Sequence, residues 1–461
     1  MNKAIYTIKR FLLTVITVGV CSSCDHLLDL DPKENIDSDQ LYKSVQYFEY
    51  GVVGVYNNLH VEYSTLLGAV LADECKLSHE NTGVDGYAVQ LNRWTYSSDD
   101  DLLHETWKDY YHALYKINTL LENMHRVPQE TTADQEALNI LAGELKGLRA
   151  FVHFELHRIF GESDDLGKQA LTIPYVTDTD LFKKPGKMTQ ADFYTLLWKD
   201  IQVAAENLNN KQAPARFSVD ATQALAARVS LYQKNYAQAI AYTSQIINAY
   251  PLATTNQYAA MWRQNQTEEV IFKLARNNDD ELRPNTLWYN FNTGKTLFYA
   301  ASKLNQLYTK DDIRATLFFG TSDPNQIAKY AGENHENRIS DLPVFRSSEL
   351  YLIRAEAYLK TGATTLALED LQTLQQARST ATIKPTQIDE AMILKERYKE
   401  LAFEGHRYFD LKRLGKPLER NKEDLAAPSD LPLLAFGSPQ YQLPIPLKEI
   451  QSNPNLGNGE W

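Results

Sequence analysis

Two pairs of consecutive helical segments constrain the fold of this chain more than any other feature of its sequence. The four segments cover residues 221–232, 235–249, 347–360 and 364–378. Small residues, among them Ala221, Ala224 and Ala227, recur in the first segment. Small side chains let two antiparallel helices approach closely, and each such pair must stack on another to bury its apolar face. The sequence therefore predicts a mostly α-helical scaffold built from helix pairs.

The two pairs resemble degenerate tetratricopeptide units that are scattered along the chain. The string YAQAI opens the second helix of the first pair, and RAEAYLKTG joins the helices of the second pair. Such scattering predicts long insertions, of which the largest covers 251–346. A short strand is expected there after Trp262. Aromatic residues at 285–299 stand among Asn, Thr and Gly without a helical period, so we expect these rings to be exposed.

Charge and motif content limit the possible functions. A net charge of −12 and a pI near 5.4 argue against a nucleic-acid partner, because binding a phosphate backbone needs a basic surface. The sequence contains no GxSxG, GxGxxG, P-loop or HExxH motif. It is rich in aromatic residues, with 27 Tyr, 17 Phe and 6 Trp, which serve as core residues or as flat binding platforms.

The N-terminus has the order of a bacterial export signal. A basic head is followed by an apolar run at 11–20 that is too short to span ~30 Å of hydrocarbon as a helix. Small residues then precede Cys24 in the string CSSC, which is typical of a lipoprotein cleavage site. We predict a signal peptide at 1–23, acylation of Cys24 and a tether over 24–38. Cys21 stands where Leu is usual, so cleavage at Cys21 or ordinary secretion remains open.

The stretch 394–415 combines an apolar face with charges of both signs and is expected to be helical. Its expected ion pairs are those of Arg397 with Glu400 and Glu404, of Glu404 with Arg407, and of Asp410 with Arg413. Interleaved charges on a helix usually form ion pairs, so we interpret this stretch as a structural clamp packed on several sides. A catalytic role for Glu404, His406 and Asp410 is the less favoured alternative.

The same stretch closely resembles the C-terminal signature of the SusD/RagB family of outer-membrane nutrient-binding lipoproteins. Further resemblances lie at 25–37, in ETWKDYYHALYKINTLLENM at 105–124, in the helix pair at 221–249, in MWRQNQTEEVIF at 261–272 and in YQLPIPLKEIQSNPN at 441–455. Together they span nearly the whole chain. The last residues depart from the family, because GNG at 457–459 replaces a common Gln-Asn pair.

This resemblance implies one SusD-like domain over 39–461. Its helical scaffold would cover about 39–60, 103–250 and 347–415, and insertions at about 67–101 and 251–346 would form a loop-rich ligand face with a few short strands. The resemblance also implies a lipid-anchored outer-membrane protein that faces the cell surface. Such a protein would capture glycans and pass them to a TonB-dependent β-barrel transporter of the SusC-like kind, over which it sits as a hinged cover. Uptake of peptides or another nutrient is the alternative.

The candidate ligand-binding residues combine ring faces with polar partners. Sugar recognition needs an aromatic face against the C–H side of the ring and polar groups for the hydroxyls. The candidates are Trp94, Trp288 and Tyr289 as platforms, with Asp73, Asn92, Arg93 and Tyr96 beside them. A core position for Trp94 is an open alternative.

No catalytic residue, metal ligand or cofactor is predicted. His153 and His157 have a spacing that binds metal, but no third ligand accompanies them, so a core helix is the favoured interpretation. Asp73–Glu74 and Asp99–Asp101 could supply the two carboxylates of a surface glycoside hydrolase. That enzyme, and a cytoplasmic tetratricopeptide scaffold for protein partners, are the rival hypotheses.

Overall fold

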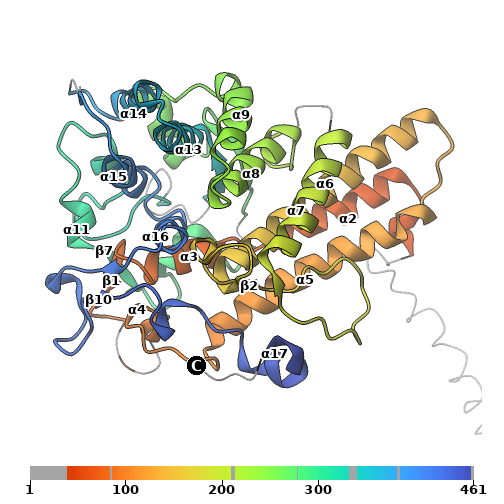
Figure 1. The fold of residues 1–461 in the computed structure, drawn as a ribbon, viewed down its shortest axis with the longest axis horizontal. Helices are drawn as coiled ribbons and strands as arrows, with labels where there is room; N and C mark the ends of the chain where they lie inside the picture. The colour runs from red at the N-terminus through yellow and green to blue at the C-terminus, as the bar shows by residue number, and fades with distance from the viewer. Residues whose placement is uncertain are drawn as a thin grey trace, which may run out of the picture.

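The computed structural model describes residues 39–81, 83, 86–208, 213–277, 279–331, 340–381 and 385–457. The predicted signal peptide, the tether and Cys24 lie outside these ranges. Figure 1 shows long helices at the right, stacked helix pairs at the top, and short strands with irregular chain at the lower left. The protein is mostly α-helical, as the sequence predicts. Within the described ranges, no helix is both long enough and apolar enough to cross a membrane.

Four long helices form the right-hand side of the molecule. They are α2 (Val45–Asn57), α5 (Asp101–Asn123), α6 (Thr132–Phe160) and α7 (Gln190–Asn207). Thr131 and Asp134 close the start of α6 with a capping box, which satisfies amide groups that have no partner within the helix. A Cβ on Gly147 of α6 would lie 2.5 Å from the Phe217 ring, so only glycine permits the close packing there.

The predicted helix pairs are confirmed. They are α8 (Val219–Tyr232) with α9 (Tyr236–Ile246), and α13 (Ser347–Lys360) with α14 (Thr364–Arg378). Ala221, Ala224 and Ala227 are fully buried, and α13 packs against α9. The two pairs therefore stack on each other although residues 247–346 separate them in the sequence, which Figure 1 shows at the top.

The strands are short, and they form two-stranded antiparallel sheets. The pairs are β4 (Val270–Leu274) with β8 (Leu342–Arg346), β1 (Cys75–Leu77) with β7 (Phe298–Ala300), β5 (Tyr289–Asn290) with β6 (Lys295–Thr296), β2 (Leu171–Thr172) with β3 (Met188–Thr189), and β9 (Leu418–Glu419) with β10 (Leu433–Leu434). The remaining α-helices are α3 (Glu62–Val70), α4 (Val89–Asn92), α10 (Thr255–Gln264), α11 (Ser302–Asn305), α12 (Arg314–Leu317), α15 (Glu390–Glu400), α16 (Arg407–Arg413) and α17 (Leu447–Ser452). The strand expected after Trp262 is β4.

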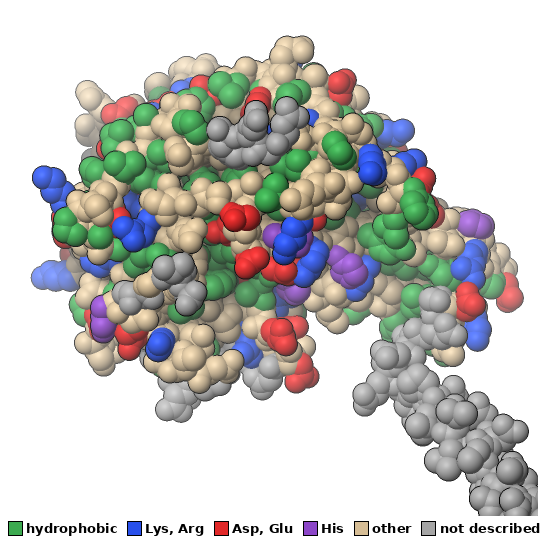
Figure 2. Space-filling view, turned by 90° about the horizontal axis from the view of Figure 1, so that it is seen from below, with side chains coloured by type: hydrophobic (Ala, Val, Ile, Leu, Met, Phe, Trp, Pro, Cys, Tyr) green, Lys and Arg blue, Asp and Glu red, His purple; other side chains and the backbone are tan. Residues whose placement is uncertain are grey.

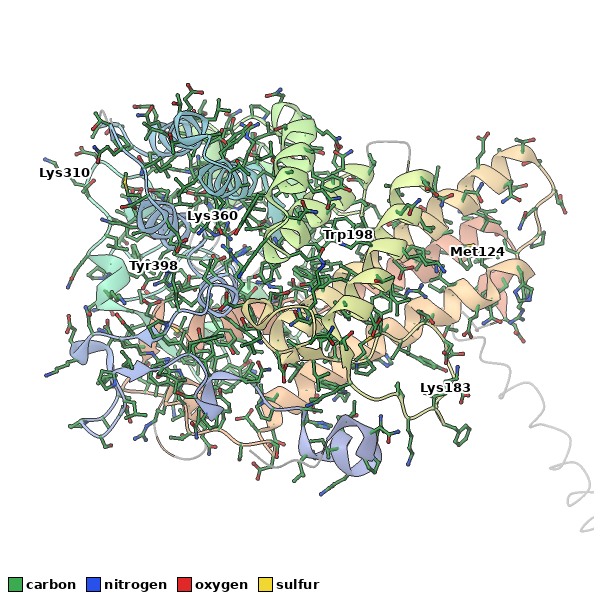
Figure 3. The ribbon with its side chains drawn as sticks, in the orientation of Figure 1. Met124, Lys183, Trp198, Lys310, Lys360 and Tyr398 are labelled. Atoms are coloured by element: carbon green, nitrogen blue, oxygen red, sulfur yellow. The ribbon has the colours of Figure 1, made fainter. Side chains whose placement is uncertain are left out.

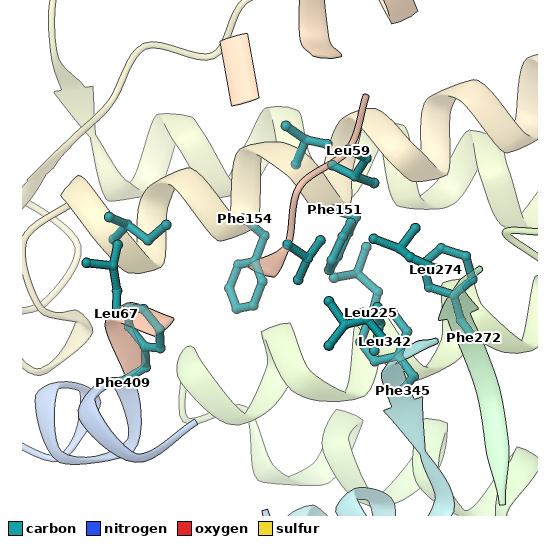
Figure 4. Close-up of a cluster of buried hydrophobic side chains, with 14 of the residues drawn as sticks. Leu59, Leu67, Phe151, Phe154, Leu225, Phe272, Leu274, Leu342, Phe345 and Phe409 are labelled. Atoms are coloured by element: carbon teal, nitrogen blue, oxygen red, sulfur yellow. The ribbon is translucent and has the colours of Figure 1, made fainter. Parts of the chain in front are cut away.

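The core joins the helices to the β4–β8 pair. Phe151 of α6 meets Phe345 of β8 with ring centroids 5.7 Å apart, and Phe345 meets Phe272 of β4 at 6.3 Å (Figure 4). Leu225 of α8 lies beside them in the same view. One continuous apolar cluster extends from Tyr42 to Leu456 and joins α8, α9 and α13 to the insertions. A second, small cluster connects α13 with α14 and consists of Leu352, Leu371, Leu374 and Leu401.

The stretch 394–415 is two helices and not one. It forms the end of α15 and all of α16, and the chain between them crosses α3. Gly405 has φ of +77°, and a Cβ there would lie 2.8 Å from the Ser64 carbonyl oxygen. A Cβ on Gly68 would in turn lie 2.5 Å from Gly405 Cα. The helix breaks because the two backbones touch at a pair of glycines.

The expected ion pairs of this stretch are partly wrong. Asp410 pairs with Arg413 at 2.9 Å, as predicted, and it also binds Arg397 at 2.8 Å. Glu404 binds Arg346 and Lys329, at 2.7 and 2.6 Å, in place of Arg397 or Arg407. Once the helix breaks, its charges face other elements. The interpretation as a clamp packed on several sides therefore holds, but with partners far away in the sequence.

Candidate functional site

Asp73 is held inside the scaffold. Its carboxylate accepts from Arg407 Nε at 2.8 Å and pairs with Lys303 Nζ at 2.8 Å, and the residue is 1% exposed. Burial alone would raise the pKa of Asp73, but Arg407 and Lys303 hold that pKa at about 2. The expected contact with a ligand is not available to this side chain. It ties β1 to α16 instead.

Trp94 lies in the core, which was the open alternative for this residue. Its side chain is 4% exposed, and its indole Nε1 donates to the Leu71 carbonyl at 2.8 Å. The guanidinium of Arg420 lies 4.1 Å from the ring centroid, where a cation favours the negative face of the ring. Arg420 also donates to the Ala72 carbonyl at 2.8 Å. Trp94 therefore fixes the segment after α4 to the end of α3.

The other polar candidates beside Trp94 also hold the chain together. Asn92 is buried and donates to the Val70 carbonyl at 3.3 Å. The Tyr96 hydroxyl donates to the Gln440 carbonyl. Arg93 is the most accessible of the three, but its guanidinium pairs with Asp430 at 2.7 Å. These residues orient the loop that carries the ligand face, and only Arg93 reaches the solvent to any extent.

The prediction that Trp288 is exposed is wrong. The side chain is 3% exposed and packs on Phe298 and Phe403, with ring centroids 6.4 and 5.6 Å away. The Trp288 carbonyl accepts from Leu297 at 2.9 Å, at the base of the β5–β6 hairpin. Trp288 ends the 3₁₀ turn that precedes β5 and packs into the core, whereas its neighbour Tyr289 begins β5 and is only half-buried.

Tyr289 does belong to a group of accessible rings. It meets Phe291, also half-buried, edge to face with centroids 4.9 Å apart. Nearby, on the strand that follows, Tyr299 stacks on the exposed His79 at 6.1 Å and an interplanar angle of 23°. The two loops are joined, because the Thr296 amide donates to the Glu80 carboxylate at 2.7 Å. We call Tyr289, Phe291, Tyr299 and His79 the ring group.

A groove of about 670 Å³ lies next to the ring group. Its lining includes Tyr63 and Tyr87, Leu282, the run Asp99–Asp101 and Glu105. Asn81 connects the two features, since its side-chain amide donates to the carbonyls of Tyr87 and Leu297, at 3.0 and 3.1 Å. The Tyr87 amide donates back to Asn81 Oδ1 at 2.8 Å. Asn81 therefore joins the segment that lines the groove to the segment that carries the ring group, and we treat the two features as one candidate site.

The groove has an acidic rim and aromatic walls. Asp100 caps α5 by accepting from Leu102 and Leu103, and burial raises its pKa although these hydrogen bonds favour the charged form. Burial also raises the pKa of Tyr87 to about 12, so its hydroxyl keeps its proton at neutral pH. Figure 1 places α4 and the start of α5 on the lower side, and Figure 2 shows acidic side chains near the middle of that side. The aromatic side chains can stack on the rings of a ligand, and the carboxylates can accept hydrogen bonds from its hydroxyl or ammonium groups.

The carboxylates proposed for a glycosidase do not form an evident pair. Asp73 and Glu74 are both 1% exposed, and burial raises the pKa of Glu74 well above its usual range. The histidines with metal-binding spacing also have protein partners. His153 Nε2 accepts from the Val176 amide at 2.9 Å, and His157 Nδ1 lies 2.8 Å from Thr172 Oγ1. In the part of the chain that the structure covers, no three His, Cys, Asp or Glu side chains gather to hold a metal ion.

The sequence analysis missed Tyr63, Leu282 and Glu105 as lining residues. Tyr63 and Glu105 sit at helix starts, where their types are common and carry no signal of a groove. Tyr87 was visible as an aromatic residue in a loop rich in Gly and Asn, which is the one signal that could have identified it. Leu282 lines the groove because of the course that the chain takes in the 251–346 insertion, which the sequence around it does not indicate.

Comparison with known proteins finds two family models that together cover most of this chain. A family model described as "SusD family" matches residues 209–459, and one described as "Starch-binding associating with outer membrane" matches residues 27–231. The SusD-like protein P38 of Formosa agariphila is 24% identical, over 90% of this chain and 93% of its own length.

Solved structures agree with the fold. A SusD superfamily protein from Bacteroides thetaiotaomicron superposes with a TM-score of 0.82 at 23% identity, covering 91% of this chain and all of its own. A laminarin-binding SusD-like protein gives a TM-score of 0.69 at 22% identity, covering 89% of this chain and 98% of its own.

Proposed function

Because the chain belongs to the SusD family, we propose that it captures glycans at the outer membrane and delivers them to a partner TonB-dependent β-barrel transporter. The observation that carries this proposal is the accessible ring group beside a groove of about 670 Å³. A family model described as starch-binding and a laminarin-binding structural neighbour support the glycan class.

The proposed ligand contacts follow from the chemistry of sugars. A pyranose presents an apolar C–H face that stacks on an aromatic ring, and its hydroxyls need donors and acceptors. Tyr289 and Phe291 are the proposed platform, and the groove carboxylates and the Tyr63 oxygen would accept hydrogen bonds from the sugar hydroxyls. Trp94, Trp288, Asp73, Asn92 and Tyr96 act as positioning residues behind this surface. Arg93 is the one polar candidate that a bound ligand could displace from its ion pair.

Binding should be tested by calorimetry against a glycan panel that includes laminarin. Removing a central aromatic from an interface costs ~2 kcal/mol or more, so Tyr289→Ala is expected to weaken glycan binding at least about tenfold. Tyr47→Ala is the matched control, because Tyr47 is an exposed ring in an edge-to-face pair with Tyr50, on α2. The control should bind like the natural chain. If no glycan binds, the glycan assignment is wrong.

The acidic rim favours a second candidate, a cationic peptide. Asp99, Asp101 and Glu105 stand at the groove, and opposite charges attract across exposed surfaces in a salt-dependent way. A neutral glycan should bind almost equally at low and high salt. A ligand that loses affinity strongly at high salt, together with peptides that bind where glycans do not, would establish the peptide role.

A further inference from the structure

The loop 178–187 displays the two most exposed large apolar side chains of the described chain. Phe182 is 94% exposed and Leu181 is 78% exposed. Figure 3 labels Lys183 on this loop, which projects at the lower right below the long helices. Single exposed apolar residues are common and need no explanation. An adjacent Leu and Phe at the tip of one projecting loop is a different case, provided the loop is fixed.

The loop is fixed at both ends and at its tip. The Thr179 amide donates to the Glu122 carboxylate at 3.0 Å, and the Phe182 amide donates to Asp180 Oδ1 at 3.0 Å. On the other side, the side-chain amides of Asn453 and Asn455 donate to the carbonyls of Pro185 and Lys184, at 2.8 and 2.7 Å. These contacts hold the backbone on both sides of Phe182 against the rest of the protein, with the ring itself 94% exposed.

The loop lies beside the point where the N-terminal segment enters the fold. Arg126 donates to Asp39, the first described residue, at 2.8 Å. Arg126 lies in the 3₁₀ turn Met124–Arg126 that follows α5, four residues or about one helical turn after Glu122. The residues between Cys24 and Asp39 extend to at most about 50 Å. An acyl group on Cys24 would therefore hold this edge of the protein within about 50 Å of the membrane, in reach of proteins embedded in it.

The charges near the tip point to a protein and not to the lipid surface. Lys184 and Lys187 are accompanied by Asp178 and Asp180, and Lys183 already pairs with Asp178 at 2.7 Å. An anionic membrane surface attracts clusters of about four to eight basic residues. This loop carries three lysines against two aspartates, which is a net charge of +1. A rigid, preorganised aromatic tip instead suits a shaped apolar socket on a protein, because little conformational freedom is lost on binding.

We propose that Phe182 and Leu181 dock in an apolar socket on the extracellular surface of the partner transporter. This inference rests on the proposed function, which supplies the transporter. The tip and the tether would then attach the same edge of the protein, while the groove remains free to accept ligand. Asp180 and Lys184 at the rim of the tip would meet polar groups around the socket.

A photo-crosslinking amino acid, p-benzoylphenylalanine, should replace Phe182 in the full-length chain in its native membrane. Irradiation is expected to give a product that mass spectrometry identifies as a TonB-dependent β-barrel transporter. Crosslinks to lipid alone, or none while the transporter still co-purifies with the natural chain, would overturn the inference and leave the proposed function intact. If the natural chain co-purifies with no such transporter, the delivery role fails, and this inference fails with it.

A substitution gives a second, independent measurement. Phe182→Ser is expected to lower the yield of co-purified transporter about tenfold, as for a central interface residue, while glycan affinity in calorimetry stays unchanged. Leu166→Ser is the matched control, because Leu166 is also an exposed apolar residue, at 60%, but lies on a different loop. An equal loss for both variants would show that the tip is not a specific contact.

Discussion

At the scale of the residue, burial separates side chains that look alike in the sequence. Trp288 and Tyr289 are neighbours, yet the first packs in the core and the second belongs to the ring group. Asp73 and Asp99 are both acidic residues near loops, yet the first is 1% exposed and paired with Arg407 while the second is exposed at the groove. Residue type alone could not sort positioning residues from accessible ones.

The pKa of Asp73 leads to a prediction about stability and pH. This pKa is about 2 in the folded protein, below the ordinary value of 3.8, so the carboxylate stabilises the fold above about pH 4 and loses that contribution as the pH falls toward 2. Asp73→Asn should therefore lower the free energy of unfolding near neutral pH, with a pH-dependent part on the order of 2 kcal/mol. Denaturant titrations across this range measure it.

The control for Asp73 is a carboxylate near the surface. Glu390 pairs with Lys360 and Lys416 there, and such pairs contribute under ~1 kcal/mol. Glu390→Gln should therefore change the free energy of unfolding much less. If the gap between the natural chain and Asp73→Asn stayed constant from pH 7 to pH 2, the assigned ion pair would be incorrect.

At the scale of the element, local patterns were predictable and long-range contacts were not. The helix pairs follow from small residues at helical spacing, which is a property of a few consecutive residues. The break in 394–415 depends on Ser64 and Gly68, which lie more than three hundred residues earlier. The buried position of Trp288 likewise depends on Phe403, which lies more than a hundred residues further along the chain. The residues within each of these two stretches form no pattern that identifies such distant partners.

Two glycines test the cause of the break between α15 and α16. Gly405 and Gly362 both have positive φ, of +77° and +84°, but only Gly405 is in contact with another backbone. Gly362→Ala should cost about 1 kcal/mol of stability, from the strained backbone alone. Gly405→Ala should cost ~1–3 kcal/mol more, because its Cβ would overlap α3. Thermal unfolding of both variants checks this, and equal losses would mean that the crossing tolerates a methyl group.

At the scale of the whole molecule, the family assignment and the fold were available from the sequence, and the ligand face was not. The resemblance at 394–415 and along the rest of the chain predicted the family, which the family model for residues 209–459 now shows. The candidate site was expected at 67–101 and 285–299, and the ring group and groove use residues from both segments. Which side chains reach the surface depended on packing that only the structure provides.

Anchoring is the prediction that belongs to the whole molecule. Acyl chains contribute ~0.8 kcal/mol per buried CH₂, and two or more chains hold a protein stably on a membrane. Cys24→Ala should therefore release folded protein from the membrane fraction, and globomycin should block fatty-acid labelling of the natural chain. Fractionation followed by immunoblotting measures the release. If Cys24→Ala stays in the membrane while Cys21→Ala is released, acylation occurs at Cys21.

The contacts behind the candidate site would also set an order of events if the predicted signal peptide exports the chain N-terminus first. In the folded protein, β1 pairs with β7, and three residues bind partners near the C-terminus. These contacts join Asp73 to Arg407, Trp94 to Arg420, and Tyr96 to the carbonyl of Gln440. None of these contacts can close until the C-terminal partner has left the translocation channel. Contacts between distant residues slow folding, because a long loop must close before they form. We therefore expect the segment around β1 and α4 to lack its native contacts, and to remain able to be threaded, until most of the chain has crossed.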